Sequence, residues 1–236
     1  MDTTEADRGA RFASYIEARR FDPPRRLLIK AAALADRREH ALDAGAGALN
    51  ATKYLLSAGF GHVTALDASP HAKKIAEGFP REQVGFVLSR FEDFEFPENY
   101  YDLVNAEFSL PFIHREHFVP VFAKLLNSVK NGGILTGQLF GTNDSWNVDN
   151  SGMNFHTRAE VEEFFHDFEL IHLEEEDHPG TTKLGEPKHW HIFHLRPEDR
   201  GRTPNSRPST VRPGVNPRCR PRAPAASPGG GRAIAR

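Results

Sequence analysis

The chain has 236 residues, of which 26% are charged and 39% hydrophobic, and its formal net charge is −2. This composition is typical of a globular protein with a substantial core, and no apolar run is long enough to span a bilayer. The single cysteine, Cys219, excludes an intramolecular disulfide, and the charged N-terminus is unlike a secretory signal, so we expect a cytoplasmic protein.

Two helices are expected before the first strand. Within residues 6–20 the apolar residues recur at near-helical spacing, and a second such run covers 27–34, after Pro23-Pro24.

Residues 41–50, Ala-Leu-Asp-Ala-Gly-Ala-Gly-Ala-Leu-Asn, carry the most informative pattern of the chain. An apolar run ends at Asp43, a Gly-Ala-Gly turn follows at 45–47, and helical spacing continues beyond it. This is typical of the first strand, turn and helix of a doubly wound α/β domain, where glycine lets the backbone turn sharply beside a ligand. The next apolar run, 63–66, ends at Asp67, roughly 20 residues on, where such folds place a carboxylate for ribose hydroxyls.

The acids and glycines together indicate a cofactor that contains adenosine. A nicotinamide dinucleotide is disfavoured, because its fingerprint needs a third glycine where this chain has Asn50. Asp43 would also place a negative charge beside the pyrophosphate. S-adenosylmethionine, a cation without phosphate, fits better.

Strands and helices alternate along the rest of the chain, which predicts a parallel sheet. The expected elements are a helix at 71–79, strands at 84–88 and 101–106, a helix at 119–129, a turn at 131–133, a strand at 134–140 and a helix at 157–166. Two strands without a helix between them, 168–173 and 189–195, predict an antiparallel hairpin at the sheet edge.

Three successive motifs resemble those of class I S-adenosylmethionine-dependent methyltransferases. They are Asp43-Ala44-Gly45-Ala46-Gly47, Ala65-Leu66-Asp67-Ala68-Ser69 and Tyr101-Asp102-Leu103-Val104. Segments 109–112, 154–157 and 188–193 resemble, within that class, small-molecule methyltransferases of the tellurite-resistance type. The resemblance implies a doubly wound, Rossmann-like, seven-stranded and mostly parallel sheet that ends in an antiparallel hairpin. Leu49, where the motif usually has a third glycine, and Arg90, where members often have an acid, depart from the pattern.

Ligands of open α/β sheets bind at the carboxyl ends of the strands. We therefore expect S-adenosyl-L-methionine to contact Asp43, Ala44, Gly45, Ala46, Gly47, Asn50, Asp67, Ala68, Arg90, Phe91, Asn105 and Glu107. Three of these have an alternative explanation. Asp67 can also cap the following helix, Phe91 alternates with Phe94 and Phe96 as core residues do, and Glu107 could be only a solvated loop residue. Asp102 is interpreted as structural.

The segment after the fifth strand is expected to border the methyl acceptor. Candidate catalytic residues there are Asp144, Trp146 and His156. A general base is optional, because the leaving sulfur becomes neutral and an anionic or soft acceptor needs no deprotonation. A metalloid oxyanion, a thiol and a small heterocycle are all compatible acceptors.

Metal and nucleic-acid sites are not expected. His189, His191 and His194 lie close together in one predicted strand, but no carboxylate stands at a diagnostic zinc-ligand spacing. Residues 197–236 contain nine Arg, two acids and eight Pro, and the remainder of the chain therefore carries a net charge of −9. Neither a basic-aromatic groove nor a membrane segment is evident in that remainder.

We divide the chain into N-terminal helices that cover the cofactor site (1–40), a methyltransferase domain (41–196) and a disordered Arg/Pro-rich tail (197–236). The tail is interpreted as an unselected extension rather than an arm for nucleic acid. The predicted function is S-adenosylmethionine-dependent methyl transfer to a small molecule by in-line displacement. The alternative is a catalytically degenerate cofactor-binding protein that acts as a sensor or partner.

Overall fold

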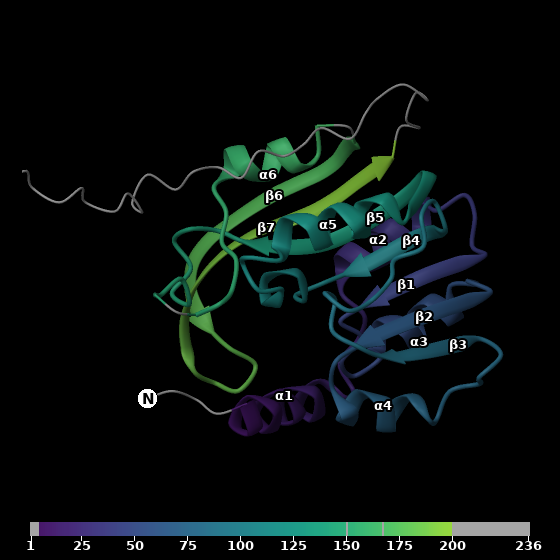
Figure 1. Cartoon of the computed structure of the whole chain (residues 1–236), viewed down its shortest axis with the longest axis horizontal. Helices are drawn as coiled ribbons and strands as arrows, with labels where there is room; N and C mark the ends of the chain where they lie inside the picture. The colour runs from purple at the N-terminus through teal and green to yellow at the C-terminus, as the bar shows by residue number, and fades with distance from the viewer. Residues whose placement is uncertain (1–4, 150, 167, 200–236) are drawn as a thin grey trace, which may run out of the picture.

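A computed structural model describes residues 5–149, 151–166 and 168–199 of the chain. Its centre is a seven-stranded sheet in the order β3-β2-β1-β4-β5-β7-β6 (Figure 1). The strands are β1 (His40–Ala44), β2 (His62–Asp67), β3 (Val84–Leu88), β4 (Tyr101–Ala106), β5 (Val129–Phe140), β6 (Phe168–Thr181) and β7 (Pro187–Asp199). Strands β1 to β5 pair in parallel, and β7 pairs antiparallel with both β5 and β6. The predicted fold class is confirmed.

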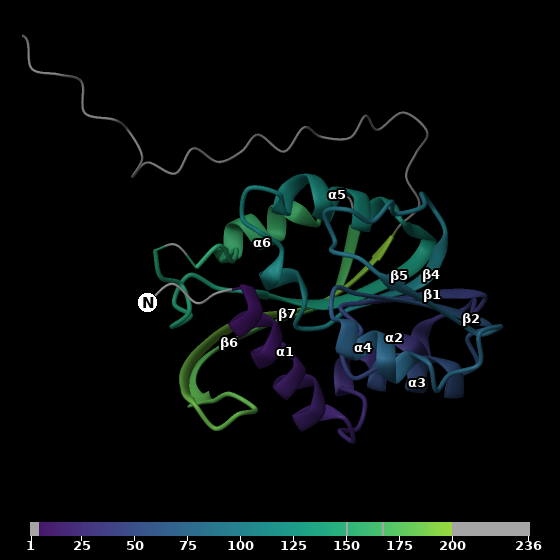
Figure 2. The ribbon, with the colours of Figure 1, turned by 60° about the horizontal axis from the view of Figure 1, so that its bottom comes forward.

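Helices cover both faces of the sheet. On one face lie α2 (Arg26–Leu34), α3 (Asn50–Ser57) and α4 (Pro70–Ala76), and on the other lie α5 (Phe118–Asn127) and α6 (Arg158–Phe164), as Figure 2 shows. A short 3-10 helix, η1 (Leu110–Phe112), follows β4. The first helix, α1 (Glu5–Arg19), runs beside α4 and the tip of the β6–β7 hairpin.

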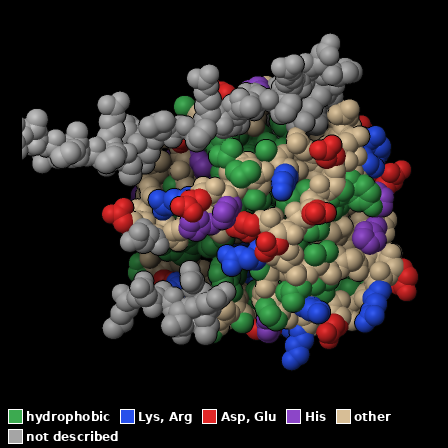
Figure 3. All heavy atoms as spheres, in the orientation of Figure 1, with side chains coloured by type: hydrophobic (Ala, Val, Ile, Leu, Met, Phe, Trp, Pro, Cys, Tyr) green, Lys and Arg blue, Asp and Glu red, His purple; other side chains and the backbone are tan. Residues whose placement is uncertain are grey.

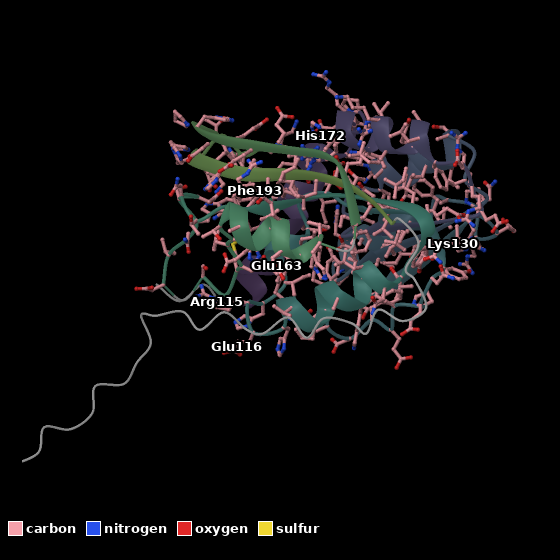
Figure 4. The ribbon with its side chains drawn as sticks, turned by 90° about the horizontal axis from the view of Figure 1, so that it is seen from above. Arg115, Glu116, Lys130, Glu163, His172 and Phe193 are labelled. Atoms are coloured by element: carbon pink, nitrogen blue, oxygen red, sulfur yellow. The ribbon has the colours of Figure 1, made fainter. Side chains whose placement is uncertain are left out.

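The core lies on both sides of the central strands, because alternate residues of each strand point to opposite faces. Leu42 and Val104 pack with α5, whereas Ala41 and Leu103 pack with α2. Figure 4 labels Phe193 on β7, next to α6 in that view, and its side chain is fully buried. Strands that are buried on both faces give continuous apolar runs, which is why the sequence predicted them well.

The start of β5 differs from the prediction. Residues 131–133 were expected to form a turn, but β5 already begins at Val129 and includes them. The pairing with β4 shifts register between Tyr101 and Leu103, which marks an irregularity in the strand. A Cβ on Gly133 would lie 2.8 Å from the Lys130 carbonyl oxygen, so a residue without a side chain is needed at this irregularity rather than at a turn.

The hairpin is longer than predicted at both ends. Strand β6 reaches Thr181, beyond the predicted end at residue 173, and includes the acidic run Glu174–Asp177. Histidines of β7 lie opposite these acids: His191 Nε2 is 2.9 Å from Glu175, and His194 Nε2 is 3.4 Å from Glu176. Strand β7 also continues past the expected domain end at 196 and pairs Glu198 with Ile134. Positions 200–236 of the predicted disordered tail lie outside the described residues.

Among the described helices, none combines the length and the apolar character that crossing a membrane requires. On the face drawn in Figure 3, acidic and basic side chains are interspersed rather than gathered into a patch of one sign.

Candidate active site

A cavity of about 100 Å³ lies at the carboxyl ends of β1 and β4. Among the predicted cofactor residues, Asp43, Gly45, Ala46, Gly47, Asn50, Asn105 and Glu107 line it. Further lining residues, which the sequence did not single out, are Tyr15, Ile16, Arg19, Pro23, Pro24, Arg25, Ala48, Ala51 and Phe108. The site is therefore built from the glycine turn, the end of β4 and the N-terminal segment.

The glycine turn brings the backbone close to its neighbours. Gly45 has a φ of +79°, and a Cβ there would lie 2.3 Å from the Ser109 Cβ, so this position requires glycine. The Gly45 N–H donates to the Leu66 carbonyl oxygen at 2.7 Å, and the Gly47 N–H donates to Asp67 Oδ2 at 2.8 Å. Leu49 also has a positive φ, +58°, with its side chain buried. It thus adopts a left-handed backbone conformation, which glycine adopts without strain.

Asp43 ties the elements of the site together. Its Oδ2 accepts hydrogen bonds from the Thr52 N–H at 2.9 Å and the Thr52 hydroxyl at 2.7 Å, and its Oδ1 accepts one from Asn105 Nδ2 at 2.9 Å. Burial raises the pKa of this carboxyl above its usual value. The contacts join β1 to α3 and β4 and fix the floor of the cavity.

Glu107 and Arg25 give the cavity an acidic and a basic side. Burial raises the pKa of Glu107 to about 7, while the positive charge of Arg25 opposes that rise. The Glu107 Oε1 atom is buried and has no hydrogen-bond partner. The guanidinium of Arg25 lies 4.0 Å from the centroid of the Phe108 ring, and Arg19 lines the same cavity. A carboxylate oxygen without a partner and two arginines in one cavity match the opposite charges of the zwitterionic amino-acid end of S-adenosylmethionine.

The remaining predicted cofactor residues lie outside this cavity lining. Asp67 accepts the Gly47 N–H and, at 2.7 Å, the Ser69 N–H, so both carboxylate oxygens are oriented by backbone donors. Ala44 is buried at the end of β1, and Ala68 and Arg90 are exposed. Phe91 is half-buried and packs against the core with Phe94 and Phe96.

The N-terminal segment closes the cavity. Ile16 of α1 is buried, and Asn50 Nδ2 donates to the Arg19 carbonyl oxygen at 2.7 Å. The sequence predicted the helix but not these cavity residues. No local pattern identifies them, because each reaches the site through a contact more than 20 residues away in the chain.

Two of the three catalytic candidates are held in structural contacts, and none of the three lines the cavity. Asp144 is fully buried in an ion pair with Lys188, and its Oδ1 also accepts the Trp146 N–H at 2.9 Å. His156 lies under α5 and α6, against Phe118 and Phe164. Burial lowers the pKa of His156 to about 4, so this ring is neutral at pH 7.

Trp146 belongs to a group of rings that we call the aromatic wall: Phe108, Phe112, Trp146 and Trp190. The ammonium of Lys188 lies 3.8 Å from the Trp146 ring centroid and 4.4 Å from that of Trp190. Phe108 belongs both to this wall and to the cavity lining. The wall therefore extends from the cavity toward the loop after β5, the region expected to border the acceptor.

The histidines of β7 face the acids of β6 rather than one another's imidazoles. His189 pairs with Asp177, and His191 and His194 pair with Glu175 and Glu176. Within the described ranges, no group of three or more His, Cys, Asp or Glu side chains is arranged to hold a metal ion.

Asp102 has the structural role that was expected. Its Oδ2 accepts the backbone N–H groups of Glu39 and His40 at 2.8 and 3.0 Å. Its other oxygen lies 2.9 Å from Lys130, which Figure 4 labels at the start of β5.

Comparisons with known proteins agree with this architecture. Residues 42–136 match the protein family described as a methyltransferase domain. No curated protein matches the chain by sequence.

Several solved methyltransferases share the fold. The Burkholderia thailandensis 1,6-didemethyltoxoflavin-N1-methyltransferase has a TM-score of 0.56 and 21% identity, over 83% of this chain and 88% of that one. TehB from Haemophilus influenzae has a TM-score of 0.59 and 16% identity, over 73% of this chain and 61% of that one. The N-methyltransferase NodS from Bradyrhizobium japonicum, in complex with S-adenosyl-L-homocysteine, has a TM-score of 0.58 and 13% identity, over 80% and 99%.

The family match covers the strands and the glycine turn that form the cavity, and the solved neighbours share the fold around it. Residues 42–136 therefore match a methyltransferase domain, and the chain has the fold of the solved methyltransferases named above.

Proposed function

We propose that the protein transfers the methyl group of S-adenosylmethionine to a small-molecule acceptor by in-line displacement, and that it does so in the cytoplasm. The observation that carries the proposal is the junction of a charged, glycine-floored cavity with an aromatic wall at Phe108. The didemethyltoxoflavin enzyme, whose structure contains a small heterocyclic ligand and S-adenosylhomocysteine, supports a small acceptor.

The charges of the cavity suggest how the cofactor would be held. Its carboxylate would lie near Arg19 and Arg25, and its ammonium and sulfonium near Glu107 and the Asp43–Asn105 pair. Asp67, oriented by two backbone N–H groups, would accept hydrogen bonds from the ribose hydroxyls. Ala68, Arg90 and Phe91 would border the adenine.

The chemistry makes modest demands on the protein. When bound, S-adenosylmethionine supplies a methyl carbon on a positively charged sulfur, so that a lone pair of the acceptor forms the new bond while the carbon–sulfur pair stays on sulfur. The chain's residues must place the acceptor atom in line at near-attack distance, a contribution of up to several orders of magnitude in rate. Asp144 is engaged by Lys188 and His156 is remote from the cavity, so we assign neither as a general base.

Calorimetric titration with S-adenosylmethionine, S-adenosylhomocysteine and NAD tests the cofactor part of the proposal. We expect micromolar binding of the first two and none of NAD. The Asp67→Ala variant should bind roughly 10- to 100-fold more weakly, since a hydrogen bond to a charged group contributes about 1.5–3 kcal/mol. A folded protein that binds neither adenosyl compound, or an Asp67→Ala variant with unchanged affinity, would contradict the assignment.

A further inference from the structure

We propose that the methyl acceptor is a planar, uncharged heteroaromatic molecule that stacks on the aromatic wall and presents a pyridine-type ring nitrogen to the cavity. The nitrogen lone pair forms the new N–CH3 bond, the carbon–sulfur pair stays on sulfur, and the ring takes over the positive charge, so no proton has to be removed. The inference rests on the proposed function and names the substrate class of the same site.

The wall is continuous with the cavity where the methyl group would lie. The Phe108 ring, which lines the cavity, meets Trp190 edge to face with centroids 6.3 Å apart. Trp190 lies 5.8 Å from Trp146, and Trp146 lies 6.4 Å from Phe112. An acceptor bound against these rings can therefore place one of its atoms at the cavity.

The first ring of the wall is held in an uncommon backbone conformation. Phe108 has a φ of +55°, in a backbone region that residues other than glycine seldom adopt. Its N–H donates to Gln138 Oε1 at 2.8 Å, which fixes that conformation. Such strain persists only where surrounding contacts enforce it, and it is concentrated at ligand sites.

The rings of the wall remain accessible from solvent. Trp146 and Trp190 are half-buried, and Phe112 is 40% exposed. Phe12 of α1, 43% exposed, lies edge-on to Phe112 at 5.5 Å and extends the same apolar surface. Neighbouring exposed aromatic rings mark binding surfaces, and a flat π system gains most from them through stacking.

The charges around the wall argue against an anionic acceptor. Lys188 contacts both indoles, but its side chain has no exposed surface and is already paired with Asp144. Arg25, which stacks on Phe108, is attracted to Glu107 within the cavity. A metalloid oxyanion would find neither cation free, and a small aliphatic thiol would leave most of the wall uncovered.

The chain offers a specific optical probe of this proposal. It contains only two tryptophans, Trp146 and Trp190, and both belong to the wall. Intrinsic tryptophan fluorescence would be titrated with lumazine, quinoline and indazole in the presence of saturating S-adenosylhomocysteine. Piperidine, dithiothreitol and sodium tellurite serve as non-aromatic comparisons. Parallel titrations of free N-acetyltryptophanamide correct the protein signal for light absorbed by each compound and for collisional quenching.

We expect saturable quenching by at least one heteroaromatic compound and none by the non-aromatic set. By calorimetry, Phe112→Ser should weaken that compound roughly three- to tenfold, the loss of one ring contact. The matched control is Tyr100→Ser, which removes a similarly exposed ring stacked on His40, away from the wall. Both variants should keep the wild-type affinity for S-adenosylhomocysteine.

The outcomes separate the two proposals. Failure to bind S-adenosylhomocysteine would overturn the proposed function itself. Three outcomes, each with normal S-adenosylhomocysteine binding, would overturn the acceptor assignment alone. They are no quenching by any heteroaromatic compound, quenching by tellurite or the thiol instead, and equal effects of the Phe112 and Tyr100 substitutions.

Discussion

Leu49 combines an unfavourable backbone conformation with a favourable side-chain environment. Its φ of +58° lies in the left-handed region, which costs a residue with a Cβ about 1–2 kcal/mol. Its side chain is 1% exposed and packs with Ile16, Ala65 and Ala72. Burial of a leucine exceeds that cost, so the departure from the usual glycine leaves the turn intact and does not favour the degenerate-protein alternative.

Two substitutions at this position separate the backbone effect from the side-chain effect. Leu49→Ala should lower the free energy of unfolding by about 2–5 kcal/mol, because it leaves a cavity without relieving the backbone. Leu49→Gly removes one more carbon yet relieves the left-handed strain, so it should be no less stable than Leu49→Ala. Urea denaturation of both variants measures this order, and a clearly less stable glycine variant would contradict the strain argument.

Glu107 is the residue whose charge should change near neutral pH. Its pKa, raised to about 7 by burial, makes the carboxyl largely protonated at pH 6 and largely ionised at pH 8. A cationic cofactor favours the ionised form, so binding lowers this pKa and releases a proton. Affinity for S-adenosylmethionine should therefore rise with pH, up to about tenfold for each unit by which the cofactor lowers the pKa.

Calorimetry at pH 6 and 8, in buffers of different ionisation enthalpy, measures both the affinity change and the proton release. Glu107→Gln should remove both effects, whereas the exposed Glu95→Gln control should retain them. A Glu107→Gln variant with an unchanged pH profile would show that another group controls binding.

At the scale of elements, the buried Asp144–Lys188 pair holds the loop after β5 against β7. Asp144 accepts the Trp146 N–H within the loop at 2.9 Å and the His191 N–H of β7 at 3.4 Å. Burial lowers the pKa of Lys188, and the pairing with Asp144 opposes that effect. The pair thus positions both tryptophans of the wall, and Asp144 is better described as a positioning residue than as a base.

Removing one member of the pair leaves the other charge buried. Lys188→Met should therefore cost about 3–5 kcal/mol of stability. Adding Asp144→Asn removes the unpaired charge and keeps an acceptor for the backbone N–H groups, so the double variant should recover part of the loss. Chemical denaturation completes this double-mutant cycle, and a loss below about 1 kcal/mol for Lys188→Met would show that the pair is solvated.

At the scale of the whole molecule, the sheet extends further along the chain than the sequence indicated. Strand β7 continues to Asp199, where it pairs with Phe168, and Glu198 pairs with Ile134 of β5. These pairings add the last part of the sheet to the domain. They include residues 197–199, which the sequence assigned to the tail.

Two truncations test this boundary. A chain that ends at Leu195 should be less stable than one that ends at Asp199 by roughly 1–4 kcal/mol, since each lost backbone hydrogen bond contributes about 0.5–1.5 kcal/mol. Thermal unfolding of both chains measures the difference. Equal melting temperatures would show that the last four residues of β7 contribute nothing.

The sequence predicted those parts of the site that a short segment specifies by itself. Asp43 lies near the end of β1, and the Gly45–Gly47 turn and Glu107 follow directly after buried strands. Their place at the strand ends therefore follows from the alternating pattern. The side of the cavity formed by Arg19 and Arg25 depends on how the N-terminal segment folds back, which no local pattern encodes. The same holds for Asp144, whose partner Lys188 lies 44 residues away, because a charge in a sequence does not reveal whether it is buried.

Two ion pairs join the N-terminal segment to the β6–β7 hairpin. Arg11 pairs with Glu186, and Lys183 lies 2.9 Å from Asp22, so the segment that lines the cavity is attached to the hairpin that carries Trp190 (Figure 1). Both ion pairs are solvent-accessible and are therefore screened by salt. Salt should loosen these ion pairs and so allow S-adenosylhomocysteine to leave the cavity faster. We therefore expect the turnover rate to increase with ionic strength as long as product release is the rate-limiting step.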